Sequence, residues 1–204
     1  MTGAGIIRLP PTEYPVFPSK DIPSIEYDNY FLSVGRLTKQ KNYSFLISEF
    51  HKHIEKNKKD ILLIIGEGEE KQRLQNLINT FNLKNNIFLL GKKKNVYPYM
   101  KKARALILSS LWEEVGFVIV EAAFSNLFVI SSDCPNGPRE FLENGKGGYL
   151  FKSDKENELA NKLQYFNNNE TDLVRFKIIA KKNSLIYTLF RHYKKLKQIL
   201  TNEN

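Results

Sequence analysis

The sequence predicts an α/β protein: a doubly wound, Rossmann-like parallel sheet of about six strands with helices on both faces. The first observation is a set of short apolar runs with few polar interruptions, as in strands that are buried on both faces. The second is that segments with helical spacing separate these runs, and such alternation favours a right-handed, doubly wound sheet. The runs are 30–34, 61–65, 87–90, 105–108, 127–131 and 148–151.

The expected helices occupy the connections between the runs. In the first two connections, apolar residues recur three or four positions apart, which is typical of an amphipathic helix. These residues are Leu46, Ile47, Phe50 and Ile54, then Leu74, Leu77, Ile78 and Phe81 after the turn Gly66-Glu67-Gly68. Further helices are expected at about 96–103, 117–125, 137–143, 156–166, 171–181 and 186–200.

The chain of 204 residues suits one domain with terminal appendages. Residues 1–27 hold five prolines and show no sustained period, so we expect an extended lead-in there. The predicted sheet and its helices fill 28–168. The segment 169–204 reads as C-terminal helices.

Composition favours a soluble globular protein, with 42% hydrophobic and 26% charged residues. No apolar run approaches the roughly 20 residues that span a bilayer, and the first residues lack the features of a signal peptide. The single cysteine, Cys134, cannot form an internal disulfide, so a reducing cytoplasm is the expected compartment. A packed structural role for this cysteine is favoured over a catalytic one.

The net charge of +9 favours anionic partners. Two interpretations stay open: a solvated lysine-rich surface, or peripheral attraction to the acidic inner face of the cytoplasmic membrane. Nucleic acid is not an expected partner, because aromatic residues do not interleave with the basic ones and no recognition module is present.

The first candidate site follows the first predicted strand, in Gly35-Arg36-Leu37-Thr38-Lys39-Gln40-Lys41. Gly35 lets the backbone turn sharply at the strand end. Arg36 and Lys41 flank a loop of four residues and can converge on one anion, Arg as a fork and Lys as a point charge. Alone, two basic residues in a surface loop are more often simply solvated.

The second candidate lies between Glu113 and Glu121, after the fourth predicted strand. Each carboxylate can accept two hydrogen bonds from a vicinal diol. Gly116 allows a ligand to approach the backbone, and the amides near Phe117 and Val118 can face a pyrophosphate at the helix start. Taken singly, Glu121 reads as an ordinary helix residue and Glu113 as a partner of the helix dipole.

Together these residues resemble the C-terminal, donor-binding half of a GT-B glycosyltransferase of family four, the glycosyl transferases group 1. That family has a Gly-Arg-Leu loop with Lys five residues past the Arg, and two glutamates separated by seven residues with Gly three after the first. The segment from Ser132 to Glu140 is similar to a subgroup that builds bacterial surface polysaccharides and glycans. The resemblance runs from about residue 28 to the C-terminus.

The resemblance implies a role for each matched residue. Arg36 and Lys41 would neutralise the donor diphosphate as leaving group, and Glu113 would hold hydroxyls of the transferred sugar, so these three are the expected catalytic residues. Glu121 would bind the ribose. The remaining donor-binding positions are Gly35, Lys92 (for the base), Gly116, Phe117 and Val118.

The family also implies the reaction. A hexose-type sugar would pass with retention from a nucleotide diphosphate sugar to a glycan or lipid-linked acceptor, with UDP favoured by its frequency in the family. No Asp-x-Asp pattern occurs, and basic residues with helix ends take the metal's place at the diphosphate in GT-B proteins. No metal and no cofactor are therefore expected.

Two departures from the family matter. Asn126 stands where Gly is frequent, a mild change because Asn tolerates the left-handed backbone of a helix C-cap. Glu114 also stands in a place often held by Gly, and we expect it to point to solvent. A complete GT-B enzyme has a further N-terminal acceptor domain, so we expect this chain to act with such a half. The alternative is an inactive remnant or regulatory subunit that binds nucleotide sugar.

Overall fold

The structure, a computed structural model, describes residues 27–114, 116–134, 136–169 and 173–187. Within these residues one sheet of six parallel strands has the order β3-β2-β1-β4-β5-β6, which is the doubly wound order. The predicted fold class is confirmed. The strands are β1 (Phe31–Val34), β2 (Leu62–Ile65), β3 (Ile87–Leu89), β4 (Ala105–Leu108), β5 (Phe128–Ser132) and β6 (Tyr149–Phe151).

Helices fill the connections, close to the predicted ranges. The prediction at 186–200 falls outside the described residues from 188 on, and 185–187 form a 3-10 turn. The lead-in expected at 1–27 also lies outside them, except residue 27. The helices are α1 (Tyr43–Ile54), α2 (Lys71–Thr80), α3 (Tyr97–Lys102), α4 (Phe117–Phe124), α5 (Pro138–Phe141), α6 (Glu158–Asn168) and α7 (Leu173–Ser184), with 3-10 turns η2 (Lys39–Lys41) and η4 (Leu185–Tyr187).

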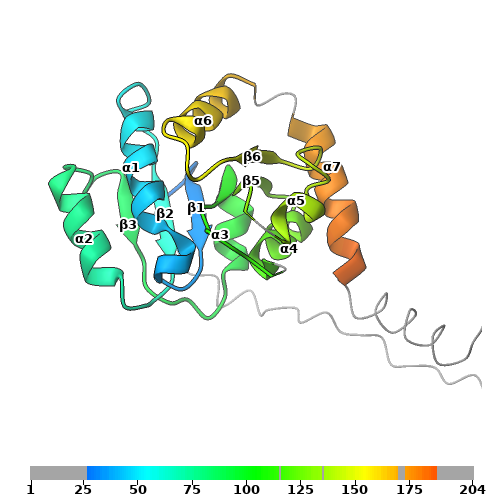
Figure 1. The fold of residues 1–204 in the computed structure, drawn as a ribbon, viewed down its shortest axis with the longest axis horizontal. Coiled ribbons are helices and arrows are strands. Elements are labelled where there is room, and N and C mark those ends of the chain that lie inside the picture. Colours follow the sequence, from blue (N-terminus) through cyan, green and yellow to red (C-terminus); the bar gives the residue numbers. More distant parts are fainter. Residues whose placement is uncertain (1–26, 115, 135, 170–172, 188–204) are drawn as a thin grey trace, which may run out of the picture.

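The sheet is buried on both faces because each strand sends alternate apolar side chains to opposite sides. In β1, Phe31 joins the core that α1, α2 and α6 cover, and Leu32 joins the core that α3, α4 and α5 cover. Figure 1 shows α1 crossing in front of β1 and β2. Helix α7 packs against α4 and β5; its Leu173 is buried, whereas Val174 and Ile178 are exposed.

The two central strands, β1 and β4, part before they end. Their paired register stops at Leu32↔Leu106, whereas β1 stays paired with β2 as far as Val34↔Ile65. Beyond that point the Ser33 hydroxyl crosses the gap and donates to the Ile107 carbonyl at 2.7 Å. The strand order reverses here, and doubly wound sheets bind their ligands in the crevice at such a reversal.

Asparagine takes the left-handed conformation in many turns of the described residues. The turn at Asn126 (φ 61°) confirms the tolerance expected there. Asn42 and Asn157 directly precede α1 and α6. The full set is Asn29, Asn42, Asn82, Asn126, Asn136, Asn144 and Asn157.

A polar cluster stands at the amino edge of the sheet, away from the predicted site. Asp60 accepts hydrogen bonds from His53 (2.7 Å) and Asn167 (2.9 Å), and pairs with Arg104 at 3.2 Å. Burial by itself raises the pKa of Asp60, but the His53 and Asn167 hydrogen bonds and the Arg104 charge lower it below its usual value. The cluster joins the ends of α1 and α6 to the starts of β2 and β4.

Helix α6 receives its N-terminal cap from α1. The buried carboxylate of Glu49 accepts hydrogen bonds from the backbone amides of Asn157 (3.1 Å) and Ala160 (3.2 Å) and also pairs with Lys52. Since the first amides of a helix have no partner within it, a carboxylate at this end stabilises the helix.

Candidate functional site

A glycine follows each of β1, β2 and β3 within two residues, and these glycines let the loops pack backbone to backbone. The Gly35 amide donates to the Ile65 carbonyl (3.0 Å), and the Gly66 amide donates to Gly91 (3.1 Å). A Cβ on Gly66 would lie 1.8 Å from the Gly35 carbonyl oxygen, so no side chain fits there. These contacts fix the loop that starts at Gly35 and carries Arg36, whose side chain is exposed.

Lys41 and Glu113 form an ion pair across the gap between β1 and β4. Lys41 comes from the turn η2 after β1, and Glu113 from the loop after β4. Their side chains are only 15% and 7% exposed, and the Ser110 hydroxyl donates to the same carboxylate oxygen at 2.6 Å. The sequence assigned these two residues to different parts of a donor; it did not predict that they touch each other.

Further hydrogen bonds tie the same two loops together. The Leu111 amide donates to the Gln40 carbonyl (2.8 Å), and the Gln40 side-chain amide donates to the Trp112 carbonyl (2.9 Å). The Ser109 hydroxyl donates to the Lys41 carbonyl at 2.7 Å. Sequence reasoning missed Gln40 and the serines. The sequence did contain an indication of Ser109 and Ser110, because they are polar residues at the end of an apolar run.

Helix α4 starts beside this pair. Its N-cap, Gly116, has a left-handed backbone (φ 66°) and no side-chain cap. A Cβ at Gly116 would lie 3.8 Å from Cγ of Glu113, which places the helix start against the carboxylate. By helix geometry the amides of Phe117 and Val118 have no acceptor within the helix. The Phe117 side chain is exposed and contacts the ring of Tyr187.

Glu121 lies in the second turn of α4 and is half-buried. Burial raises the pKa of its carboxyl. The pKa of Tyr97, on α3, is raised as well, first by burial and then by the charge of Glu121. Lys92 follows Gly91 in the loop after β3 and is exposed, and Glu114 is exposed as expected.

The charges of the ion pair act on two buried groups. Burial raises the pKa of the Tyr43 phenol, and the nearby Glu113 raises it further. Burial likewise raises the pKa of the Cys134 thiol, which also senses the charges of Glu113 and Lys41. Cys134 is 5% exposed, which agrees with the packed role expected for it.

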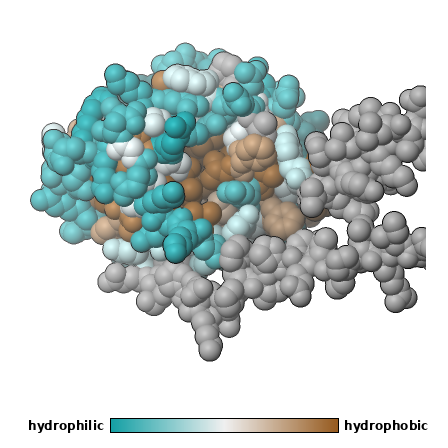
Figure 2. Space-filling model, turned by 90° about the horizontal axis from the view of Figure 1, so that it is seen from below, coloured by the Kyte–Doolittle hydropathy of each residue, from teal (hydrophilic) through white to brown (hydrophobic). Residues whose placement is uncertain are grey.

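The carboxyl edge of the sheet combines apolar and polar surface. Figure 2, which views the molecule from this side, shows apolar surface in the middle and hydrophilic residues around it. Large apolar side chains next to the glutamate loop are exposed here, among them Leu111, Trp112 and Phe117. A site at this edge can therefore meet both charged and apolar parts of a ligand.

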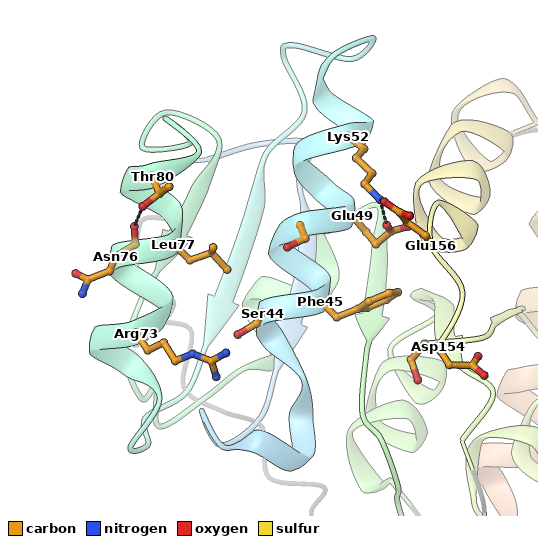
Figure 3. Close-up of a pocket in the computed structure, with 12 residues that line it drawn as sticks. Ser44, Phe45, Glu49, Lys52, Arg73, Asn76, Leu77, Thr80, Asp154 and Glu156 are labelled. Carbon is orange, nitrogen blue, oxygen red and sulfur yellow. Dashed lines mark hydrogen bonds and ion pairs between the residues drawn. The ribbon is translucent and has the colours of Figure 1, made fainter.

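A separate hollow of about 660 Å³ runs along α1, between α2 and the loop 153–156. Figure 3 shows Glu49 and Lys52 on the side of α1 that faces Glu156, while Arg73 projects from α2. Arg73 pairs with Glu70. Lys52 pairs with Glu49 and with Glu156. None of the predicted site residues lines this hollow.

Two features do not occur among the described residues. No three or more His, Cys, Asp or Glu side chains gather there as metal ligands would. None of the helices described is both long enough and apolar enough to cross a membrane. The expectation of no metal and no cofactor stays a prediction.

The strand order and the residues at its reversal define the class of protein: a Rossmann-like α/β domain whose candidate site lies at the carboxyl edge of the sheet. The chain belongs to the glycosyl transferases group 1 family, which matches residues 18–183. The resemblance seen in the sequence is thereby confirmed.

Individual relatives support the assignment to this family. An uncharacterized glycosyltransferase of Methanocaldococcus jannaschii is 47% identical over 112 residues, which cover 55% of this chain and 28% of that protein. A Campylobacter jejuni protein is 35% identical over 138 residues, covering 67% of this chain and 37% of its own length. It is named N-acetylgalactosamine-N,N'-diacetylbacillosaminyl-diphospho-undecaprenol 4-alpha-N-acetylgalactosaminyltransferase.

The fold has solved counterparts. A crystal structure of an S. aureus TarM mutant, in complex with Fondaparinux, alpha-GlcNAc-glycerol and UDP, matches with a TM-score of 0.76 and 25% identity. The match covers 85% of this chain and 35% of TarM. This chain thus spans between about a quarter and two-fifths of the length of these relatives.

Proposed function

We propose that this chain binds the nucleotide-sugar donor of a glycosyl transfer reaction. The observation that carries the proposal is the Lys41–Glu113 ion pair, which closes the crevice between β1 and β4 with a cation and a carboxylate side by side. A sugar diphosphate needs both: a cation for its phosphates, and an acceptor for its hydroxyls. Both groups lie where doubly wound sheets bind their ligands.

The diphosphate would lie between the loop after β1 and the start of α4. Arg36 is exposed near the start of the loop after β1. Its planar guanidinium can bind two phosphate oxygens at once, while the Lys41 ammonium acts as a point charge. The start of α4 adds unpartnered amides and the positive end of the helix dipole. These charges stabilise the leaving diphosphate as the glycosidic bond breaks.

The carboxylates would hold the sugars. Glu121 accepts hydrogen bonds from the ribose hydroxyls, and Glu113 from hydroxyls of the transferred hexose. Glu113 is already oriented by Ser110 and Lys41, so it would present fixed acceptor positions. The loop after β3, with Lys92, would contact the base. Gly35 and Gly116 would let ligand atoms approach the backbone.

UDP as nucleotide is supported by the TarM complex, which contains UDP. A lipid-linked glycan acceptor is supported by the Campylobacter relative, whose name specifies an undecaprenol diphosphate substrate. Transfer would retain the anomeric configuration: the acceptor attacks from the face that the phosphate leaves, and the departing phosphate takes the acceptor's proton. The acceptor would be held by an N-terminal GT-B half, at the cytoplasmic face of the membrane in a bacterial surface-glycan pathway.

Titration of the full chain with UDP tests donor binding. Arg36→Ala and Lys41→Ala should each weaken binding by about 1.5–3 kcal/mol, the cost of losing a hydrogen bond to a charged group. Lys102→Ala is the matched control, since it removes the same kind of charge from a pair with Asp28 outside the proposed site. Unchanged affinity in both site variants would refute the diphosphate assignment.

A second experiment separates an enzyme component from a protein that only binds the donor. The chain is mixed with an N-terminal half of a group 1 relative, a UDP-hexose and a lipid-linked acceptor, and the product is sought by mass spectrometry. Product that disappears in Glu113→Gln supports transfer. Donor binding without transfer, across such partners, favours the remnant or regulatory role.

A further inference from the structure

The crevice between β1 and β4 is held at two levels. Deep in the sheet, the Ser33 hydroxyl bridges to β4 just past the last paired residues. At the surface, the two loops that leave these strands are joined again by Gln40, which contacts Leu111 through its carbonyl and Trp112 through its side chain. The Lys41–Glu113 pair joins the same two loops.

Gln40 stands next to Lys41, and Trp112 stands next to Glu113. A single side-chain hydrogen bond of 2.9 Å therefore links the immediate neighbours of the two charged residues. Of the contacts that join these loops, this one can be removed without changing the backbone, the charged pair or the buried serines. It is also near the surface, where the exposed loop has the fewest other restraints.

Because Gln40 carries no charge, it cannot substitute for either member of the pair. Its side-chain amide instead adds one hydrogen bond to those that set the distance between the loop carrying Lys41 and the loop carrying Glu113. A site that must place a phosphate against Lys41 and a sugar against Glu113 at once depends on this spacing, since small misplacements of binding groups are costly.

We infer that Gln40 is a positioning residue for donor binding, acting through the Trp112 carbonyl to hold Glu113 in place opposite Lys41. This inference rests on the proposed function, because the ligand whose binding it tunes is the sugar nucleotide. It makes a separate claim about the free protein as well: the loop that carries Trp112 and Glu113 loosens when the Gln40 amide is removed.

The chain supplies its own reporter for that claim. Trp112 is the single tryptophan of the sequence, and its side chain is 53% exposed. Its emission and its quenching by acrylamide therefore report on this loop alone. A substitution that merely lowered overall stability would not change either signal in a protein that is still folded.

The experiment compares the full chain with Gln40→Met, which removes the amide at similar length, and Gln40→Asn, which keeps an amide one methylene too short. Gln72→Met on α2 is the control; there the amide bonds Asn76 at 3.0 Å within one helix. Circular dichroism confirms folding. UDP affinity is measured by calorimetry, and Trp112 quenching is measured without UDP.

We expect both Gln40 variants to bind UDP about 3- to 10-fold more weakly, which is the effect of one neutral hydrogen bond, and to show stronger quenching of Trp112. Gln72→Met should match the unaltered chain in both measurements. Wild-type UDP affinity in the two Gln40 variants overturns the inference, as does unchanged quenching. If the unaltered chain does not bind UDP, the proposed function fails, and unchanged quenching then rejects the loop restraint independently.

Discussion

Lys41 and Glu113 are 72 residues apart in the chain, yet they form an ion pair where β1 and β4 separate. Both are largely shielded from water. An isolated buried charge is costly, so each residue depends on the other as well as on any ligand. The pair is thus both part of the candidate site and part of what holds the site together.

This double role predicts different results for single and double variants. Lys41→Met should lower the free energy of unfolding by about 2–3 kcal/mol, because it leaves the Glu113 carboxylate buried without its cation. Lys41→Met combined with Glu113→Gln should recover most of that stability, since no uncompensated charge remains. UDP affinity should stay low in both. Urea unfolding and calorimetry check this, and a double variant as unstable as the single one would contradict it.

Glu121 predicts a conflict between stability and binding. Burial raises the pKa of its carboxyl in the folded chain, so the native state binds more protons than the unfolded state between the two pKa values. Its contribution to stability is present below the unfolded pKa and is lost as the pH rises through the folded pKa. Glu121→Gln should therefore raise the Tm at pH 7.5 relative to wild type, with a smaller difference at pH 4.

The same variant should bind UDP more weakly, because the proposed function has Glu121 hold two ribose hydroxyls, for which an amide is a poorer partner than a carboxylate. Glu114→Gln is the control, since Glu114 is exposed, and it should leave the Tm unchanged. A Glu121→Gln protein that is less stable at pH 7.5 would show that the carboxylate is stabilised, rather than destabilised, by its surroundings.

Asp60 predicts the opposite pH dependence. Its pKa is lowered in the folded chain, so its stabilising contribution is present above the unfolded pKa and is lost as the pH falls through the folded pKa. Asp60→Asn should lower the free energy of unfolding at pH 7 by about 1.5–3 kcal/mol, the cost of hydrogen bonds to a charged group. The difference should shrink below pH 4. UDP affinity should not change, because Asp60 lies at the amino edge.

The position of Gly66 leaves no room for a side chain. A methyl group there would meet the Gly35 carbonyl oxygen at 1.8 Å, whereas one on Gly35 would meet the Tyr43 hydroxyl at 3.0 Å. Backbone cannot yield as a side chain can, so Gly66→Ala should cost about 2 kcal/mol or more and Gly35→Ala less. Thermal unfolding ranks the two variants. Equal stability of Gly66→Ala and wild type would mean that the loops can separate freely.

The sequence predicted the sheet well because strands buried on both faces leave unbroken apolar runs, such as 105–108, which matches β4. It also brought Lys41 and Glu113 to one edge, since the carboxyl ends of parallel strands lie together. The direct contact between Lys41 and Glu113 could not be predicted from the sequence. That contact depends on where β1 and β4 part, a property of strand twist and register that no residue spacing encodes.

The role of Gln40 could not be predicted from the sequence either. Nothing in its neighbourhood marks it, because its partner is a backbone carbonyl 72 residues away, and carbonyls are the same in every sequence. The serines at the strand ends are different. Ser109, Ser110 and Ser132 are polar residues that end apolar runs, and all of them are buried, so their positions could have predicted a hydrogen-bonded crevice.

The carboxylate of Glu49 has a consequence for the order in which the chain assembles. Its hydrogen bonds to Asn157 and Ala160 join residues 108 and 111 positions apart, and such distant pairs form late because a long loop must close first. The start of α6 therefore lacks its cap until α1 is already in place. Among the described elements, β6 and α6 follow α1 in the chain, so the Glu49 carboxylate is synthesised before the amides that it caps.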